Sequence, residues 1–340
     1  MPSGSLQTPL LIGIAGLGRM GLYHLERLGL RNDCQVVAVF DTDPSRTGQA
    51  DAIGCRLYRS RHEFLDDDNV ELVLIATPPA THAPLTNDAL RAGKHVAVET
   101  PLCLTVNEAD EMLEAAARAG RMLSVIHHRR WDADFRAAKA AADSGQIGRL
   151  SLARLISWSY GIGTPTDGTA GWRTDPQQGG GALFEVGAHC FDQLLQLAES
   201  EPQTVFARIP AGRTSENSED AFTVIVQFRD GFSAEINVDR RSYVPLDTGW
   251  TLTGTKGGFR DFQLHSITDA GEIFVSPVER LPTQWDRFYD GIVAHLRLGG
   301  ALPVTGEQGR GVIRLIEAAR RSAACGRPVA FHAGTTIVSP

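Results

Sequence analysis

Residues 10–21 read LLIGIAGLGRMG, and this stretch decides the fold of the N-terminal part of the chain. Residues 10–15 are almost continuously apolar, as expected of a strand covered on both faces of a parallel sheet. Gly16, Gly18 and Gly21 then form a G-x-G-x-x-G pattern that opens a helical segment at residues 19–30. The first two glycines permit a tight turn and the close approach of a pyrophosphate, and the third lets the helix pack against the strand. The stretch predicts a dinucleotide-binding unit, with Arg19 and Met20 beside the phosphates at the helix N-terminus.

A carboxylate follows at the end of the second predicted strand. Asp41 comes directly after residues 36–40 and 20 residues after Gly21, the spacing at which an acidic residue accepts hydrogen bonds from ribose hydroxyls. Because its charge would repel a 2′-phosphate, Asp41 favours NAD over NADP. Arg46 lies close by in the sequence and leaves NADP open.

Short apolar runs alternate with helical stretches throughout the first third of the chain. The predicted strands are residues 10–15, 36–40, 72–76, 95–99 and 122–126. This alternation builds a doubly wound parallel sheet by right-handed crossovers. Between the last two strands, Thr105 and Glu108 form a capping box, and Gly120 stands where a helix stops. We therefore expect a Rossmann domain over residues 1–127.

Two of these strands deliver further residues to the edge of the sheet where ligands bind. Thr77 and Pro78 follow the third strand and Glu99 ends the fourth, so all three are expected to line the dinucleotide. His82 comes just beyond and is either a cofactor contact or a packing histidine, since a single histidine carries little specificity.

The sequence changes character after about residue 150. Longer alternating runs at residues 150–159, 221–228 and 232–240 predict an open, mostly antiparallel sheet with one packed face. Two helices are expected near the end, at residues 285–299 and after the capping residues Thr305 and Gln308. Residues 161–181 are rich in Gly, Pro, Thr and Asp and predict a functional loop. We assign residues 128–340 to an α/β domain for substrate binding and assembly, and expect a homo-oligomer, dimer or tetramer, because the open sheet face must be covered.

An acid/base pair is predicted in this second domain. Gly179, Gly180 and Gly181 precede a predicted helix over residues 182–198, in which Glu185 and His189 are four residues apart on one face. An imidazole can exchange a proton with a hydroxyl or carbonyl group while a carboxylate orients it. An ordinary surface pair is the alternative interpretation.

Composition argues against several classes of function. The net charge is −7 and no basic run occurs, which argues against a nucleic-acid partner. The five cysteines show no metal-ligand spacing, so we expect reduced thiols and no metal site. No apolar stretch approaches the length of a membrane span, and the N-terminus has no basic region typical of a signal peptide. A cytoplasmic location is expected.

Taken together, these motifs resemble the Gfo/Idh/MocA oxidoreductase family, which includes glucose-fructose oxidoreductase and inositol dehydrogenase. The resemblance covers nearly the whole chain and rests on AGLGRMG (15–21), Asp41, ATPPATH (76–82), AGKHVAVETP (92–101), HHRRWDADF (127–135), the segment 171–192, GTKGG (254–258) and the segment 303–323. It implies a Rossmann domain followed by an α/β domain whose sheet covers the active site and often mediates oligomers. His189 stands at the family's catalytic histidine and Glu185 at its aspartate.

The chain departs from the family pattern at one catalytic position. Thr100 stands where the family's Glu-Lys-Pro motif has its lysine, and a threonine cannot place a positive charge on the reacting oxygen. The three lysines, Lys94, Lys139 and Lys256, offer no obvious substitute. The resemblance places Arg129, Arg130 and Arg173 near the substrate, where one of them could supply charge but not shuttle a proton. Trp172 is either a core residue or a stacking surface for a sugar or nicotinamide.

The leading hypothesis is an NAD(P)-dependent dehydrogenase or reductase that acts on a CH–OH group of a sugar, polyol or related small molecule. Two other interpretations stay open. One is a redox-neutral enzyme with tightly bound NAD that performs elimination, epimerisation or glycoside cleavage. The other is a non-catalytic dinucleotide-binding regulator, to which the loss of the lysine points.

Overall fold

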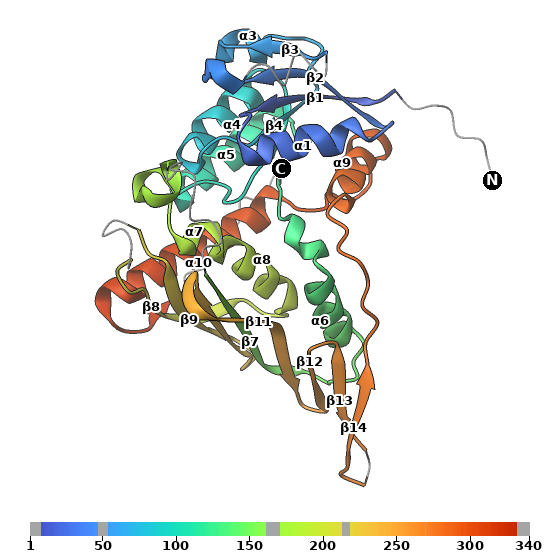
Figure 1. Ribbon diagram of the computed structural model, residues 1–340, viewed down its shortest axis with the longest axis vertical. Coiled ribbons are helices and arrows are strands. Elements are labelled where there is room, and N and C mark those ends of the chain that lie inside the picture. The colour runs from blue at the N-terminus through green and yellow to red at the C-terminus, as the bar shows by residue number, and fades with distance from the viewer. Residues whose placement is uncertain (1–7, 47–53, 161–170, 213–217, 269, 332–340) are drawn as a thin grey trace, which may run out of the picture. The chain divides into compact units, whose positions relative to one another are not determined.

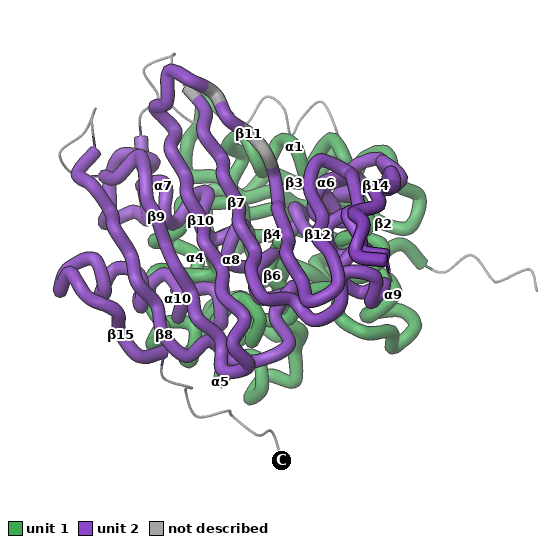
Figure 2. The backbone as a smooth tube through the Cα atoms, turned by 90° about the horizontal axis from the view of Figure 1, so that it is seen from below, with its two compact units in different colours: residues 1–127, 286–310 green, residues 128–285, 311–340 purple. Residues whose placement is uncertain are grey.

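The computed structural model describes residues 8–46, 54–160, 171–212, 218–268 and 270–331. The chain divides into two compact units (Figure 2). The first contains residues 1–127 and 286–310, and the second contains residues 128–285 and 311–340. A boundary at residue 127 alone would place residues 286–310 in the second domain, whereas this segment packs with the first unit. Ser124 Oγ, for example, donates to the Val304 carbonyl at 2.7 Å.

Among the described residues of the first unit, six strands form one parallel sheet in the order β3-β2-β1-β4-β5-β6 (Figure 1). Its strands are β1 (Leu10–Ala15), β2 (Cys34–Phe40), β3 (Arg56–Tyr58), β4 (Leu72–Ile75), β5 (His95–Val98) and β6 (Leu123–Val125). Its helices are α1 (Arg19–Gly29), α3 (Arg61–Leu65), α4 (His82–Arg91), α5 (Val106–Ala119) and α9 (Arg287–Leu298). The predicted Rossmann sheet is confirmed. The short edge strand β3 has no apolar run and was not predicted.

The predicted helix stops and starts are also present. Thr105 accepts a hydrogen bond from the Glu108 N–H at 3.2 Å, the Glu108 carboxylate accepts one from the Thr105 N–H at 3.0 Å, and Gly120 ends α5 with φ of 60°. Thr305 and Gln308 form the corresponding box before α10 (Gly306–Cys325), at 3.2 and 3.1 Å. These local signals therefore fix both helix starts.

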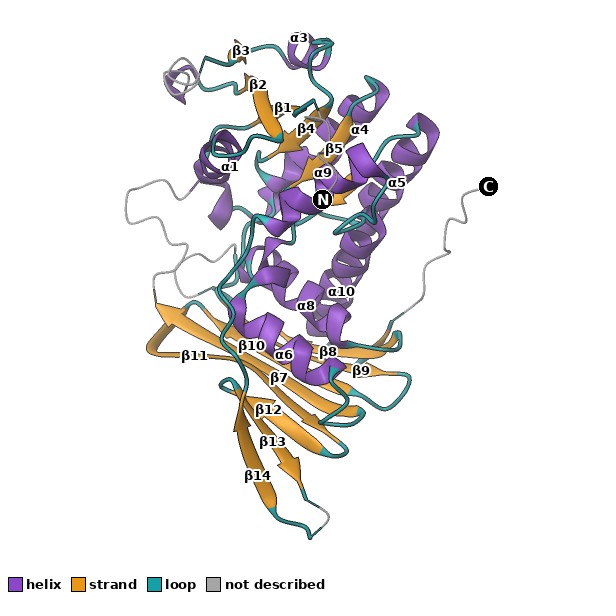
Figure 3. Cartoon of the chain, turned by 90° about the vertical axis from the view of Figure 1, so that its right-hand side faces the viewer, coloured by secondary structure: helices purple, strands orange, loops and turns teal. Residues whose placement is uncertain are grey.

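The described residues of the second unit form a nine-stranded sheet in the order β14-β13-β12-β11-β7-β10-β9-β8-β15 (Figure 3). The strands are β7 (Leu150–Tyr160), β8 (Pro202–Arg208), β9 (Ala221–Phe228), β10 (Ser233–Asp239), β11 (Arg241–Gly254), β12 (Gly257–Arg260), β13 (Gln263–Ile267), β14 (Ile273–Pro277) and β15 (Val329–Ala330). Only β7 and β10 pair in parallel among them, so the prediction of a mostly antiparallel sheet is confirmed.

Helices cover one face of this second sheet. They include α6 (Ala133–Asp143), which packs on β11, and α7 (Ala182–Glu185) and α8 (Gly187–Leu197), which pack on β9 and β10 (Figure 3). Alternate residues of β9 and β10 point into this layer and are buried, as the alternating pattern predicts. Trp250 on β11 is fully buried there, and its indole N–H donates to Gln193 Oε1 on α8 at 2.8 Å.

Of the predicted loop at residues 161–181, residues 161–170 lie outside the described part of the chain. The described remainder forms two short 3-10 turns, Gly171–Thr174 and Pro176–Gln178.

Candidate functional site

The glycine loop of the first unit has the shape that its sequence predicts. Gly16 has φ of +94°, and a Cβ there would lie 2.7 Å from the Ala76 carbonyl oxygen. A Cβ on Gly21 would lie 1.8 Å from the Gly16 carbonyl oxygen. Contacts within the protein, without any ligand, therefore require glycine at both positions. Among the described residues, a Cβ on Gly18 would meet only the end of the Arg46 side chain, at 3.4 Å, so these residues leave this side of the loop open.

The start of α1 is suited to an anion. Gly18 is the N-cap residue and provides no side-chain cap, and the first turn contains no acidic residue. The first N–H groups of the helix are thus available to a phosphate, which the helix dipole also favours. Arg19, which is exposed, and Met20 begin this helix. The residues present fit the pyrophosphate of a dinucleotide.

Asp41 is tied to the glycine loop. Its Oδ2 accepts a hydrogen bond from the Leu17 N–H at 2.6 Å and its Oδ1 accepts one from the Asp43 N–H at 2.8 Å. Arg46 lies 3.9 Å from Asp41 Oδ2 and donates to Asp43 at 3.1 Å. Two carboxylates therefore offset the charge of Arg46, while each Asp41 oxygen retains a second lone pair for a ribose hydroxyl.

His82, which was expected to be either a cofactor contact or a packing histidine, is buried between two turns of the first unit. Its ring is 1% exposed, with Nδ1 2.8 Å from the Pro101 carbonyl oxygen and Nε2 2.9 Å from the Thr77 carbonyl oxygen. The ring therefore lies between the segments that follow β4 and β5 and directs both nitrogens to main chain. Of the two interpretations of His82, the contacts favour the packing histidine, since a buried ring in this position supports the two segments and directs neither nitrogen to a cofactor.

Glu99, at the end of β5, belongs to a buried chain of polar groups. Its Oε1 lies 2.8 Å from His24 Nε2 on α1, and His24 Nδ1 lies 2.6 Å from the Tyr289 hydroxyl on α9. Its Oε2 accepts a hydrogen bond from the Thr100 N–H at 3.0 Å, next to the cis peptide bond between Thr100 and Pro101. The sequence analysis missed His24 and Tyr289. The signal for His24 was its place on the apolar face of α1, between Gly21 and Leu28.

The predicted continuous helix over residues 182–198 is wrong. The segment breaks at Val186 into α7 and α8, and the His189 N–H donates to the Val186 carbonyl at 3.1 Å. The Glu185 carboxylate is held by two arginines, Arg240 at 2.6 Å and Arg173 at 3.2 Å. The pair Glu185 and His189 thus does not share a helix face, and Arg240 is a contact that sequence reasoning missed.

His189 lies in a cluster of rings in the second unit. Its ring centroid is 5.3 Å from that of His128, which in turn is 4.4 Å from that of Trp285. The Trp285 indole N–H donates to Asp132 Oδ1 at 2.5 Å, and Arg129 lies 3.6 Å from the same carboxyl group. His128, Trp285 and Asp132 therefore form an ordered setting around His189, and His128 is the second histidine that could exchange protons there.

The predicted substrate-binding arginines separate into two kinds. Arg130 donates twice to the buried Asp192, at 2.8 and 2.6 Å, and is committed to that carboxylate. Arg129 is exposed. Arg173 binds Glu185 and lies over the Trp172 ring, 4.5 Å from its centroid. Arg129, Trp172 and Arg173 thus remain candidates for substrate contact, whereas Arg130 has a structural partner.

Two family models match this sequence. The model described as the oxidoreductase family with an NAD-binding Rossmann fold, of the Gfo/Idh/MocA proteins, matches residues 10–127, and that of the Gfo/Idh/MocA C-terminal domain matches residues 135–260. The chain belongs to the Gfo/Idh/MocA oxidoreductase family.

Several known proteins are similar to this chain over most of its length. The 1,5-anhydro-D-fructose reductase of Ensifer adhaerens is 30% identical, over 81% of this chain and 84% of the reductase. The scyllo-inositol 2-dehydrogenase (NADP(+)) IolW of Bacillus subtilis is 27% identical, over 92% of this chain and 93% of the dehydrogenase. The solved structure of an NAD-binding protein from Listeria innocua is 28% identical with a TM-score of 0.83, and the match covers 95% of this chain and 97% of that one. The chain is thus an NAD(P)-binding oxidoreductase of the Gfo/Idh/MocA family.

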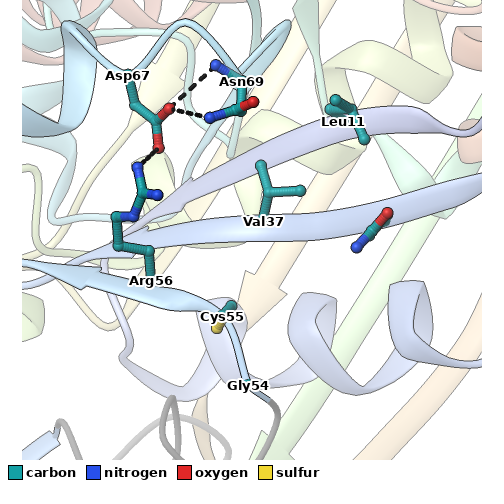
Figure 4. A pocket seen from close by; sticks show the side chains of 8 residues that line it. Leu11, Val37, Gly54, Cys55, Arg56, Asp67 and Asn69 are labelled. Atoms are coloured by element: carbon teal, nitrogen blue, oxygen red, sulfur yellow. Dashed lines mark hydrogen bonds and ion pairs between the residues drawn. The ribbon is translucent and has the colours of Figure 1, made fainter.

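A cavity of about 740 Å³ opens elsewhere in the first unit of this Gfo/Idh/MocA protein (Figure 4). It is lined by Leu11, Gln35, Val37, Gly54, Cys55, Arg56, Asp67 and Asn69. Asp67 is held by Arg56 at 3.1 Å and by the Asn69 side chain at 2.9 Å. The cavity lies at the amino ends of β1, β2 and β3, whereas Gly16 and Asp41 follow the carboxyl ends of β1 and β2, so it is separate from the dinucleotide loop.

The described residues contain no cluster of three or more His, Cys, Asp or Glu side chains that could hold a metal ion. No helix among them is both long and apolar enough to span a membrane.

Proposed function

We propose that this protein is an NAD-dependent dehydrogenase or reductase that acts on a CH–OH group of a polyol, sugar or related small molecule. The proposal rests on the presence of two features in this one chain. A glycine loop shaped for a pyrophosphate lies beside Asp41, and His189 lies in a cluster of ordered rings. Inositol and anhydrofructose are named as substrates of relatives that are similar over most of this chain, which supports a polyhydroxylated substrate.

The first unit would hold the cofactor through Gly16, Gly18, Arg19, Met20 and Gly21 at the phosphates and Asp41 at the adenosine ribose. We place Arg46, Thr77, Pro78 and Glu99 along the same edge of the sheet. When bound, the nicotinamide accepts or donates the hydride of the reaction. Asp41 favours NAD, because Asp41 and Asp43 offset the charge that Arg46 could offer to a 2′-phosphate.

His189 would exchange the proton of the substrate hydroxyl as the general acid or base. Glu185 serves as an anchor, since Arg240 and Arg173 hold its carboxylate. Arg173 and Trp172 present a cation and an aromatic face, a combination that suits hydroxyl groups and a sugar ring. Thr100, at the position of the family's lysine, can donate a hydroxyl hydrogen bond but no charge, so stabilisation of the reacting oxygen falls to other groups.

A two-stage experiment tests this proposal. The purified protein is titrated with NAD, NADH, NADP and NADPH, and the cofactor that binds best is then used to screen sugars, polyols and their oxidised forms at the NADH absorbance band. Tight NAD binding with a substrate-dependent change in NADH supports the dehydrogenase. Tight binding without turnover across the panel would favour a redox-neutral enzyme or a regulator, and no binding would refute the proposal.

A further inference from the structure

Trp172 and Arg173 are packed against the start of α7 in the second unit. The Arg173 carbonyl accepts a hydrogen bond from the Gly181 N–H at 3.1 Å. A Cβ on Gly180 would lie 2.5 Å from the Arg173 carbonyl oxygen and 2.6 Å from that of Trp172. Glycine at this position therefore allows the backbone of the two residues to approach the turn that precedes α7.

The guanidinium group of Arg173 is held in two ways. It lies over the Trp172 ring, 4.5 Å from the ring centroid, and its Nε donates to Glu185 Oε1 at 3.2 Å. Stacking on an aromatic ring and a hydrogen bond to a charged group both restrict the rotamers of a long side chain. The orientation of the guanidinium group is thus set before any ligand binds.

The opposite edge of this guanidinium group is available to a ligand. Among the described residues, the one side chain that bonds to Arg173 is that of Glu185, which it contacts through Nε. The remaining N–H donors, on Nη1 and Nη2, form a planar fork. The Arg173 side chain is 23% exposed, so solvent or a ligand can reach it. Arg173 therefore offers two parallel N–H groups to an acceptor.

A carboxylate matches this edge better than a hydroxyl or a phosphate group does. Its two oxygens can accept the two parallel hydrogen bonds, and hydrogen bonds between charged groups are about twice as strong as those between neutral groups. A phosphate monoester carries a larger negative charge, and the Glu185 carboxylate beside Arg173 repels that charge more strongly. Glu185 is also bound by Arg240, at 2.6 Å, so Arg173 shares this carboxylate with a second cation.

We propose that Arg173, stacked on Trp172, binds a carboxylate group of the substrate, which makes the substrate a polyhydroxy acid such as a uronate or an aldonate. The inference rests on the proposed function and names its substrate class. Glu185 and Gly180 are positioning residues in this scheme, because they act through Arg173. Glu185 lies four residues before His189, which limits the distance between the carboxylate site and the residue that exchanges the proton.

The test compares ligands that differ in one group. Glucuronate, galacturonate and gluconate carry a carboxylate where glucose, galactose and sorbitol carry a CH₂OH group, and glucose 6-phosphate carries a phosphate on the corresponding carbon. Kd values are measured by calorimetry in the presence of NAD, and kcat/KM is measured wherever turnover occurs. The wild-type protein should bind at least one acid about tenfold or more tightly than its neutral partner, and more tightly than the phosphate.

Two variants of Arg173 and one control separate binding from folding. In Arg173→Gln, the preference for the acid should disappear, while the affinity for the neutral partner changes little. Arg173→Lys keeps the charge but loses the fork, so it should retain only part of the preference. Arg208→Gln is the matched control, because Arg208 is exposed on β8 of the same unit and its loss removes the same charge. Its preference should equal that of the wild type.

The results that would overturn the inference are distinct from those that bear on the proposed function. If no acid binds the wild-type protein more tightly than its neutral partner, or if the phosphate binds more tightly than the acids, the inference is wrong. Turnover of a neutral sugar with NAD would then show that the proposed function stands. Equal losses for acid and neutral ligands in Arg173→Gln would show a purely structural role and would also overturn the inference. If the wild-type protein binds no dinucleotide, the proposed function fails and the inference fails with it.

Discussion

Alanine substitutions at two glycines of the same loop should have opposite effects on fold and on ligand binding. Gly21→Ala places a Cβ 1.8 Å from the Gly16 carbonyl oxygen, where the backbone must move. Gly18→Ala places it 3.4 Å from the end of the flexible Arg46 side chain. The backbone of Gly18, with φ of −71° and ψ of −171°, is one that alanine adopts freely.

The magnitudes follow from these contacts. Overpacking against a rigid backbone costs about 1–3 kcal/mol or more, so Gly21→Ala should lower the free energy of unfolding by at least that amount. For Gly18→Ala, the gain from a less flexible unfolded chain, about 0.4–1 kcal/mol, offsets the preference for glycine over alanine at an N-cap. Its stability should therefore stay within about 1 kcal/mol of the wild type. Its methyl group would occupy the open side of the loop, so NAD affinity should fall at least tenfold, about 1.4 kcal/mol.

Denaturant unfolding without cofactor gives the stability of each variant, and an NAD titration gives the affinity. The expected pattern is a stable Gly18→Ala that binds NAD poorly and a destabilised Gly21→Ala. If Gly18→Ala is stable and binds NAD as the wild type does, the pyrophosphate does not approach this face of the loop, and the assignment of the glycine motif is refuted.

Four further predictions concern single side chains. Asp41→Ala should weaken NAD binding and narrow the preference over NADP, and an unaltered preference in the two titrations would mean that Asp41 does not contact the ribose. His189→Ala should reduce turnover by at least about 100-fold and leave NAD affinity within about threefold of the wild-type value. Unchanged turnover would exclude the acid/base role of His189. Burial lowers the pKa of His82 from 6.5, so the unfolded chain takes up a proton that the native protein does not, and stability should fall as the pH drops below about 6.5. His82→Gln should flatten that dependence between pH 7.5 and 5.5 in denaturant unfolding, and an equally steep curve would contradict the assignment. Burial raises the pKa of the Cys34 thiol to about 12, whereas Cys325 is exposed. A thiol reagent at pH 8 should thus modify Cys325 rapidly and spare Cys34, as peptide mapping can establish.

The fold was predictable where its signals are local. Each buried strand of the parallel sheet is an apolar run of the right length, and the two capping boxes mark the starts of α5 and α10 within four residues of sequence. Strand β3 contains three residues, one of them an exposed arginine, and its pairing with β2 is a tertiary effect. The break at Val186 was missed for a similar reason. The helical pattern continues through it, whereas a Cβ on Gly187 would lie 3.3 Å from the Phe222 ring on β9, a neighbour that the sequence does not show.

The residues of the candidate site were likewise predictable only where their signals are local in the sequence. Spacing alone predicted the glycine loop, and the tightest of its steric needs, that of Gly21 against the Gly16 carbonyl oxygen, arises within the motif itself. Spacing could not decide between the two roles of His82, since its carbonyl partners, Pro101 and Thr77, lie in two different turns. It also paired Glu185 with His189, although two arginines compete for that carboxylate and one of them, Arg240, is 55 residues away.

Long-range polar contacts explain why residues 286–310 return to the first unit. His24 occupies the buried face of α1 with Leu25 and Leu28, and a buried imidazole requires partners. That requirement can be deduced from the helical pattern, but its partner Tyr289 lies 265 residues further along the chain. Beside it, Arg27 binds Asp286, and Arg31 binds Asp290 at 2.8 Å. Because α1 has three such partners on or next to α9, the helix that presents its N-terminus to the cofactor is held from its far end by a segment 259 to 265 residues further along the chain. The cofactor-binding unit is therefore complete only when that segment is present.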